Sequence, residues 1–570
     1  MAQASLDDAN MVSFPTLDLL LLTFNCAKAP IDVPVFAGHL QQALSSHSAA
    51  SSISSLPDLV VFSLQEAAPL GHAFAGSYFL NPYFLRFGEA LSLAATQAEG
   101  HQFGGDDDED NEENTGEGAA QVQQGQARSP NGPKQPYHFV RQAHVGMTAI
   151  LMYARDMAAI HDVEVAHCGF GVADMGNKGA VGLRIAYGRK DDYLGSEPSK
   201  LTFVATHLAA MEWNVRRRNA NWRSIVAGLT FSNPDDVIAA AASASKATAG
   251  LGRGHQGRNH DEAASAPRSA EEEAEADAAD AAGDGAWLLL GQQQHEIDVR
   301  HRLQDLSIFR PDNLLFVAGD LNYRIGDERP PADAAFPTAS NWPEFLKRDQ
   351  LTNERLAGRT FHGMSEAPID FPPTYKYDIL SEEDINAGAV PDNDDEIKRH
   401  AESPDSDGAA PIPWKYATHR WPSWCDRVLY LDVPEWAKNQ WKRGQPPLAS
   451  ATTTPEVKVT SYQPLPLMRT SDHQPVYFRA QVPLLPKNLY ERTEEESAVS
   501  ESDSDVLIDP RIHSPIAIDP DAWSRRSRAR NRERIAGAGM LLFNTKEGAA
   551  VMVTTVVVLV GLYWAWVGLL

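Results

Sequence analysis

The sequence predicts an α/β fold in which packed β-sheets are covered by helices. Short apolar runs typical of buried strands recur along the chain, and helical patches such as residues 214–229 fall between some of them. No convincing internal repeat is present. Alternation of the two kinds of element favours layered sheets. The runs expected to form strands are residues 17–23, 59–64, 148–153, 179–185, 201–206, 314–318, 427–431 and 476–480.

The composition limits the class of protein. The chain has 570 residues, of which 43% are hydrophobic, so it is globular rather than collagen-like or fully disordered. The formal net charge of −26 argues against a general nucleic-acid binder, because such proteins need a basic surface for phosphate contacts. Three cysteines in this length exclude a disulfide framework and suit a reducing compartment.

One globular body is expected within residues 12–485. Three stretches in it, near 97–135, 233–285 and 381–410, are acidic or rich in small residues, and we expect them to be disordered insertions. Residues 486–547 are polar and are expected to form a flexible linker, which carries six arginines between positions 525 and 534.

Residues 548–570 are uncharged and are expected to form a transmembrane tail anchor. As a helix they would extend about 35 Å, enough for a hydrocarbon core of about 30 Å. Tyr563, Trp564 and Trp566 fit an aromatic belt, and the arginines upstream would keep the globular body in the cytosol. We favour the endoplasmic reticulum membrane over the outer mitochondrial membrane, and a buried core helix is the alternative to a membrane span.

Groups that can bind a metal ion or phosphate stand next to several of the predicted strands. Each of them singly is an ordinary turn, capping or structural residue, so their joint occurrence carries the argument. Strand ends are rigid positions from which side chains can converge, and carboxylates, amides and histidines together suit phosphate hydrolysis assisted by a hard metal ion. These residues are Asn25, Glu66, His207, Asp320, Asn322, Asp472 and His473.

Two longer segments resemble a known family. Phe316–Arg324 and Arg420–Leu429 look like the paired signatures of inositol polyphosphate 5-phosphatases, with Val317 where that family usually has Trp. The resemblance implies the endonuclease/exonuclease/phosphatase fold, a four-layered α/β/β/α sandwich. The tail anchor is similar to that of a tail-anchored fungal-type member. Shorter segments that resemble the family occur in the expected order at 176–179, 206–210, 217–219, 373–377 and 471–476.

The resemblance also implies a role for each residue at the site. Glu66 would bind Mg²⁺, with Asn25 beside it as a further catalytic and metal-binding group. Asp320 would orient and deprotonate the attacking water. Asn322 would hold the attacked phosphoryl group or its water, and His207 would donate to a phosphoryl oxygen.

His473, oriented by Asp472, would donate to another phosphoryl oxygen as negative charge builds in the transition state. The resemblance places the substrate phosphates against a further set of mainly cationic side chains. Asn177 and Lys178 would lie near the 1-phosphate. The side chains expected at the 4-phosphate and beside it are Arg324, Tyr375, Lys376 and Arg420.

We therefore expect an Mg²⁺-dependent phosphatase that hydrolyses the 5-phosphate of phosphatidylinositol 4,5-bisphosphate by direct attack of water. Related phosphoinositides and soluble inositol phosphates stay open as substrates. Two other classes of function also stay open. One is a phosphodiesterase of the same fold, similar to a sphingomyelinase or a nuclease. The other is a catalytically inactive, membrane-tethered lipid-binding scaffold. Nucleic acid is not an expected partner.

Overall fold

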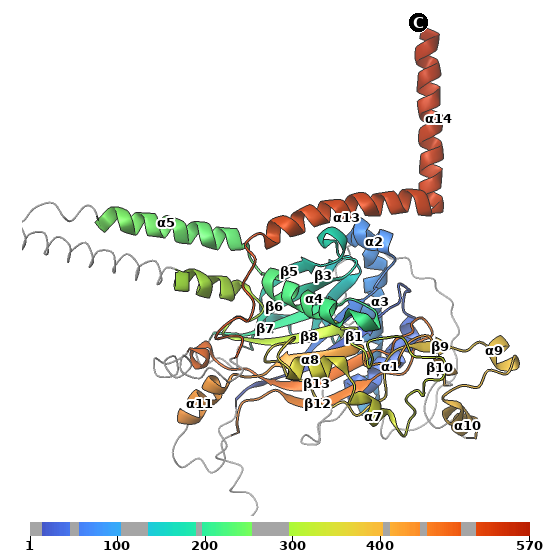
Figure 1. Cartoon of the computed structure of the whole chain (residues 1–570), viewed down its shortest axis with the longest axis horizontal. Coiled ribbons are helices and arrows are strands. Elements are labelled where there is room, and N and C mark those ends of the chain that lie inside the picture. The colour runs from blue at the N-terminus through green and yellow to red at the C-terminus, as the bar shows by residue number, and fades with distance from the viewer. Residues whose placement is uncertain are drawn as a thin grey trace, which may run out of the picture.

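Two β-sheets pack face to face in the computed structural model, and helices cover their outer faces (Figure 1). This is the four-layered α/β/β/α arrangement that the sequence predicts. The structure describes residues 14–45, 56–103, 135–189, 197–252, 296–402, 411–444, 453–491 and 509–569.

The first sheet has six strands in the order β12-β13-β1-β2-β4-β3, and the second has five in the order β11-β8-β7-β6-β5. β1 and β2 run parallel, as do β7 and β8. The first sheet consists of β1 (Thr16–Asn25), β2 (Leu59–Gln65), β3 (His138–Val145), β4 (Thr148–Ala154), β12 (Lys458–Pro464) and β13 (Val476–Pro483). The second sheet consists of β5 (Ile160–Gly169), β6 (Gly179–Tyr187), β7 (Ser199–His207), β8 (Asn313–Asp320) and β11 (Asp426–Leu431). The short strands β9 (Tyr377–Ile379) and β10 (Trp414–Tyr416) pair separately.

Strand β1 shows why the central strands read as unbroken apolar runs. Because successive side chains of a strand point to opposite faces, Leu19 and Leu21 enter the core between the sheets, whereas Leu20 and Leu22 enter a second core under the outer helices. Both faces of the strand are therefore buried, and both need apolar residues. All eight predicted strands are present.

Helices form the two outer layers and the connections. The first sheet is covered by α1 (Val33–Ser45) and α3 (Ser77–Phe103), with α2 (Leu70–Ala75) between them in sequence. The second is covered by α4 (Val215–Gly228) and α8 (Gln350–Leu356). The remaining helices are α5 (Pro234–Gly252), residues 296–306, α7 (Trp342–Leu346), α9 (Glu382–Asn386), α10 (Asp394–Glu402), α11 (Glu435–Arg443), α13 (Ala522–Asn544) and α14 (Lys546–Leu569).

The three predicted insertions are partly helical. Residues 97–103 continue α3, and residues 234–252 form α5. Between 381 and 402 the chain forms α9 and α10, which differs from the disorder that the acidic composition predicts. The physical reason at α9 is a capping box, in which Ser381 and Asp384 satisfy each other's backbone N–H groups. Residues 104–134, 253–285 and 403–410 lie outside the described residues.

The segment predicted to be a flexible linker also differs from the expectation. Residues 487–490 form a short 3₁₀ turn, and residues 509–544 lie on the catalytic body. Helix α13 crosses the body and packs along α2 (Figure 1). The polar composition concealed this packing because the buried face of α13 includes Glu533 and small residues rather than an apolar stripe. Residues 492–508 lie outside the described part of the chain.

Helix α14 meets the length and hydropathy expected of a membrane span. Within Lys546–Val567, an 18-residue window has a mean hydropathy of 2.1, and none of that window is buried inside the protein. The helix points away from the body (Figure 1). Its exposed surface therefore fits a membrane span better than the alternative of a core helix.

The buried ion pairs around Arg427 yield a prediction on stability. Its guanidinium bonds to Glu366 through two nitrogens, at 2.5 and 2.6 Å, and lies 3.0 Å from Asp349, with no exposed surface. We expect Arg427→Met to lower the free energy of unfolding by about 3–5 kcal/mol, because it leaves buried carboxylates unpaired. Chemical denaturation measures this change.

The matched control is Arg302→Ala, which removes an exposed pair with Asp298 on one helix. We expect this control to change the free energy of unfolding by less than about 0.5 kcal/mol. Equal effects of the two substitutions would show that the buried network does not hold β11 in the sheet.

Candidate active site

The carboxyl ends of two pairs of parallel strands meet at one place between the sheets. In the first sheet Asn25 is paired with Gln65, directly before Glu66, and in the second His207 is paired with Asp320. The facing sheets are joined here by a hydrogen bond of 3.0 Å from Asn25 Nδ2 to Asp320 Oδ2. Four of the predicted site residues are thus brought together by strand register.

Asp320 lies at the centre of this cluster and is almost fully buried. Its Oδ2 accepts hydrogen bonds from Asn25 and from His207 Nε2, the latter at 3.1 Å, and its Oδ1 accepts from the backbone N–H of Asn322 at 3.1 Å. Burial alone would raise the pKa of Asp320, but His207, His473 and Lys178 lower it far below its ordinary value. The carboxylate is therefore ionised at neutral pH.

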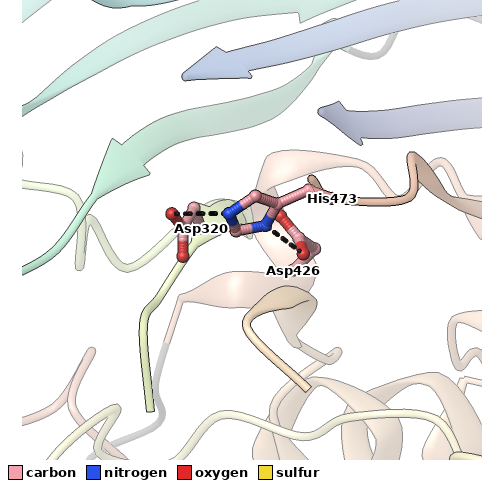
Figure 2. A group of neighbouring side chains, drawn as sticks. All are labelled: Asp320, Asp426 and His473. Atoms are coloured by element: carbon pink, nitrogen blue, oxygen red, sulfur yellow. Dashed lines mark hydrogen bonds and ion pairs between the residues drawn. The ribbon is translucent and has the colours of Figure 1, made fainter. Parts of the chain in front are cut away.

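His473 faces Asp320 and is oriented by Asp426 (Figure 2). Its Nδ1 lies 2.9 Å from Asp426 Oδ2, and the same oxygen accepts from Thr374 Oγ1 at 2.8 Å. The prediction that Asp472 orients His473 is wrong, because Asp472 pairs with Lys376 at 2.6 Å. Asp472 stands at a bend before His473, and its carboxylate is taken up by this pair with Lys376.

Two carboxylates hold His473 in its charged form. Burial would lower its pKa, but Asp426 and Asp320 outweigh burial and raise the pKa to about 9. Its Nε2 is 4.0 Å from Asp320 Oδ2, too far for a hydrogen bond, and 3.5 Å from the amide nitrogen of Asn25. The Nε2 proton is thus available to a ligand that binds beside His473 and Asp320.

Asp426 is the functional residue that sequence reasoning missed. It stands inside the Arg420–Leu429 segment, but its role depends on strand register. In the antiparallel pairing of β8 with β11, Asp426 lies directly opposite Asp320. A buried Asp at the start of an apolar run, within a segment that resembles a catalytic signature, was the available signal.

Glu66 combines a constrained backbone with a cationic surrounding. It has a positive φ of 45°, which is uncommon outside glycine and typical of functional sites. Its Oε2 lies 2.8 Å from Lys28 Nζ. Burial would raise its pKa, but His207, Lys28 and Lys178 lower it. A carboxylate that already holds a cation at this position suits a divalent metal ion, for which oxygen ligands are preferred.

Besides Glu66, two further candidates for a metal ligand are Asn25 and the cluster of Asp320, Asp426 and His473. The Oδ1 of Asn25 accepts from the N–H of Ala27 at 3.1 Å while its Nδ2 donates to Asp320, so its amide positions the catalytic carboxylate. Asp320, Asp426 and His473 are also close enough to hold a metal ion. However, His473 Nδ1 bonds to Asp426 and its ring is protonated at neutral pH, which does not suit a histidine ligand. The donor chemistry therefore favours Glu66, near Asp320.

A stack of three side chains lies beside this cluster. The guanidinium of Arg324 lies 4.2 Å from the centre of the Tyr375 ring, and that ring is 4.5 Å from the His473 ring. Arg324 Nε donates to the carbonyl of Asn322 at 3.1 Å, and another guanidinium nitrogen contacts Asn322 Oδ1. The third nitrogen of the guanidinium, Nη1, is buried and has no hydrogen-bond partner among the described residues. It is a donor available for an anion.

The other predicted substrate contacts fall into two groups: Lys178 and Asn177, which lie near the site, and Lys376 and Arg420, which already form ion pairs. Lys178 contacts His207, and burial lowers the pKa of Lys178 to about 8 in spite of Asp320 and Glu66. The Oδ1 of Asn177 is buried and has no partner within the described part of the chain. By contrast, Lys376 pairs with Asp472, and Arg420 pairs at 2.8 Å with fully buried Glu212, so both already serve structural ion pairs.

Residues 22–479 match the family described as Endonuclease/Exonuclease/phosphatase family 2. The chain belongs to this family. The match contains every predicted site residue, from Asn25 to His473, and ends before the linker and helix α14. Family membership thus confirms the fold class and the resemblance that the two signature segments carry.

Curated relatives and one solved structure give more specific likenesses. The type II inositol polyphosphate 5-phosphatase 15 of Arabidopsis thaliana is 27% identical over 315 residues, 55% of this chain and 21% of the relative. The inositol-1,4,5-trisphosphate 5-phosphatase 1 of Schizosaccharomyces pombe is 25% identical over 390 residues, 65% of this chain and 23% of the relative. The chain thus spans less than a quarter of either relative.

The solved structure is the inositol polyphosphate 5-phosphatase domain of SPsynaptojanin, in complex with inositol (1,4)-bisphosphate and a calcium ion. It is 18% identical, with a TM-score of 0.44, and the likeness covers 86% of this chain and 94% of that domain.

The carboxylate beside His473 yields a prediction on its titration. The pKa of His473 is raised above the unfolded value, so we expect the ring to be protonated at pH 7 and to lose its proton near pH 9. Asp426→Asn removes the nearest negative charge and should lower this pKa by at least about 1 unit. Selective ¹³C labelling of histidine and NMR titration measure it.

The raised pKa of His473 also determines how its contribution to folding stability depends on pH. The favourable contribution of His473 is fully present below about pH 6.5 and is lost as pH rises through about 9. Asp472→Asn is the matched control, since Asp472 pairs with Lys376, and should shift the His473 pKa less than Asp426→Asn does. An unshifted His473 pKa in Asp426→Asn would contradict this arrangement.

Proposed function

We propose that this chain is a phosphatase that hydrolyses the 5-phosphate of phosphatidylinositol 4,5-bisphosphate, with water as the direct nucleophile. One observation carries the proposal: a charged His473, held by Asp426, presents its Nε2 beside the ionised carboxylate of Asp320, 4.0 Å away. A donor and an acceptor side by side suit a phosphoryl group bound against both, which needs a donor on its oxygens and an acceptor for the attacking water. The names of the curated relatives support the choice of the 5-phosphate.

The residues divide the work of phosphoryl transfer between them. Asp320, fixed by Asn25 and His207, accepts a hydrogen bond from the attacking water and orients it in line with the bond that breaks. Its low pKa makes it a weak base, which suffices because a loose transition state needs little proton removal before attack. His473 donates from Nε2 to a phosphoryl oxygen, and Asn322 stands beside Asp320 to hold the same group.

A divalent metal ion, which we propose to be Mg²⁺, completes this site at Glu66. When bound, such an ion neutralises charge on the phosphoryl and leaving oxygens. Glu66 suits it because its carboxylate is ionised, partly buried and already paired with the Lys28 ammonium. Lys178, Arg324 and Tyr375 then remain for the other phosphates of the substrate, where Arg is suited to bidentate contacts and Lys to point-charge contacts.

The proposed reaction yields a prediction for Asp320. We expect Asp320→Asn to lower kcat for phosphate release by at least about 100-fold, because the water loses its acceptor and His473 loses a facing charge. Release of inorganic phosphate from a panel of phosphoinositides and soluble inositol phosphates measures it. Chelation of divalent ions should abolish release from the wild type, and added Mg²⁺ should restore it.

The matched control is Asp298→Asn, which removes an exposed carboxylate that pairs with Arg302 on its own helix and should leave kcat unchanged. Full phosphate release by Asp320→Asn would refute the mechanism. Cleavage of a phosphodiester without release of inorganic phosphate would favour the alternative of a phosphodiesterase. Substrate binding without any turnover would favour the inactive scaffold.

We further propose that α14 anchors the protein in the endoplasmic reticulum membrane, with the catalytic body in the cytosol. The exposed apolar surface of Lys546–Val567 supports this, as do the arginines of α13 that precede it. Deletion of residues 548–570 should move the protein from the membrane fraction to the soluble fraction on carbonate extraction. The deleted chain should keep its activity on soluble inositol phosphates, and its retention on membranes would refute the anchor.

A further inference from the structure

Helix α13 presents a small, polar face to the catalytic body. Its buried residues Ala529, Glu533 and Gly537 are four residues apart, so they lie in one line along the helix. This line packs against α2, with further contacts to β5, α4 and residues 172–174 (Figure 1). The face therefore meets the body at the loop 171–178, which joins β5 to β6.

Glu533 makes the central contact of this interface and has no exposed surface. Its Oε1 accepts a hydrogen bond of 2.8 Å from the backbone N–H of Gly176. Arg526 holds both carboxylate oxygens, at 2.6 and 3.0 Å, and Arg530 lies 3.3 Å from Oε2. Two turns of the same helix thus supply the cations that neutralise the carboxylate, which contacts the loop.

The loop that Glu533 contacts has a conformation that needs outside support. Ala173 and Asp174 have φ values of 54° and 61°, in the left-handed region that residues with a Cβ avoid. The carbonyl of Ala173 accepts from Arg532 at 3.2 Å, so α13 holds the loop at two points, on either side of Met175. Such strained backbone persists when the surrounding structure fixes it.

The loop leads directly to the site around Asp320. Gly176 is followed by Asn177 and Lys178, and Lys178 contacts His207, whose Nε2 bonds to Asp320. Gly176 is itself tightly packed, since a Cβ there would lie 2.7 Å from the N–H nitrogen of Gly146. A shift of the loop would therefore change where Asn177 and Lys178 present their polar groups.

The backbones of α13 and α2 also approach each other closely, at Gly537. A Cβ at Gly537 would lie 2.5 Å from the backbone nitrogen of Ala75 and 2.7 Å from the carbonyl carbon of Phe74. Only glycine permits this approach of the two helices. At the other end of α13, α14 begins after the single residue Thr545, whose hydroxyl donates to the Leu541 carbonyl at 2.6 Å.

We propose that Glu533 is a positioning residue for substrate binding, which fixes the Gly176–Asn177–Lys178 backbone from the helix that precedes the membrane span. The inference rests on the proposed function, because Asn177 and Lys178 matter only if they receive the substrate's 1-phosphate. It gives α13 a role in the active site that a simple tether would not have. The 1-phosphate, which joins the inositol ring to the lipid, would then bind to the loop 171–178. That loop is supported by the helix that precedes the proposed membrane span.

Kinetics on the full chain in detergent test this inference with soluble substrates. Glu533→Ala should raise KM for inositol 1,4,5-trisphosphate about tenfold, the size expected for loss of one charge-assisted hydrogen bond, and should lower kcat by less than about threefold. With inositol 4,5-bisphosphate, which lacks the 1-phosphate, KM should change by less than about twofold. Glu533→Gln keeps an acceptor for Gly176 and should recover part of the loss.

A second variant, Arg532→Ala, tests the same loop through a different contact. Hydrogen exchange tests it without relying on enzyme activity. Arg532→Ala removes the contact to Ala173 and should raise the same KM by a smaller factor. In Glu533→Ala, hydrogen exchange of the amides at 172–178 should quicken about tenfold while exchange in β7 and β8 is unchanged. Ile535→Ala, on the exposed face of α13, is the matched control and should leave KM and exchange as in the wild type.

The outcomes separate this inference from the proposed function. Failure of the wild type to release phosphate from any substrate would refute the proposed function, and the exchange measurement would still test the contact. Wild-type KM and exchange in Glu533→Ala would overturn the inference. So would a loss of thermal stability with KM unchanged, because that result assigns Glu533 a structural role only.

Discussion

The organisation of this site depends on one buried charge, the carboxylate of Asp320 at the junction of the two sheets. A desolvated carboxylate is costly unless donors surround it. Here each sheet supplies donors, Asn25 from the first and His207 from the second. The need to satisfy this charge fixes the register between the sheets, and the hydrogen bond from Ser63 to the carbonyl of Ala318, at 2.9 Å, supports the same alignment.

The central strands and the strand-end residues could be predicted from the sequence because both depend on local patterns. A strand buried on both faces must be apolar throughout, so β1, β2 and β8 are evident in the printed residues. Strands β3, β5 and β12 lie at sheet edges, where half-exposed faces carry polar residues that hide the pattern. The site residues at the ends of the central strands were found for the same reason.

Contacts that depend on long-range register could not be predicted. Asp426 orients His473 only because β11 pairs with β8 so that Asp426 and Asp320 are opposite, and no local pattern encodes that pairing. Asp472 was the natural choice from adjacency, yet it points to Lys376. Helix α13 was missed because the burial of Glu533 depends on Gly176, more than three hundred positions away in the chain.

The packed α13 also changes the physical picture of how the body meets a membrane. A flexible linker would let the body sample many orientations. Under the proposed anchoring by α14, a helix seated on α2 through Gly537 would instead present the body to the membrane in a preferred one. The 171–178 loop lies against this helix, so the arrangement of the site and the proposed attachment to the membrane would share one set of contacts. Only residues of α13 that face the 171–178 loop should affect substrate binding through these contacts.

The most direct test of the central claim is a crystal structure of the full chain with Mg²⁺ and inositol 1,4,5-trisphosphate that carries a slowly hydrolysed phosphorothioate at position 5. We expect this group to lie against both His473 and Asp320, with a phosphorothioate oxygen within hydrogen-bond distance of Nε2 and the metal ion at Glu66. A ligand whose 5-position lies away from His473 and Asp320, or a metal ion bound away from Glu66, would contradict the account.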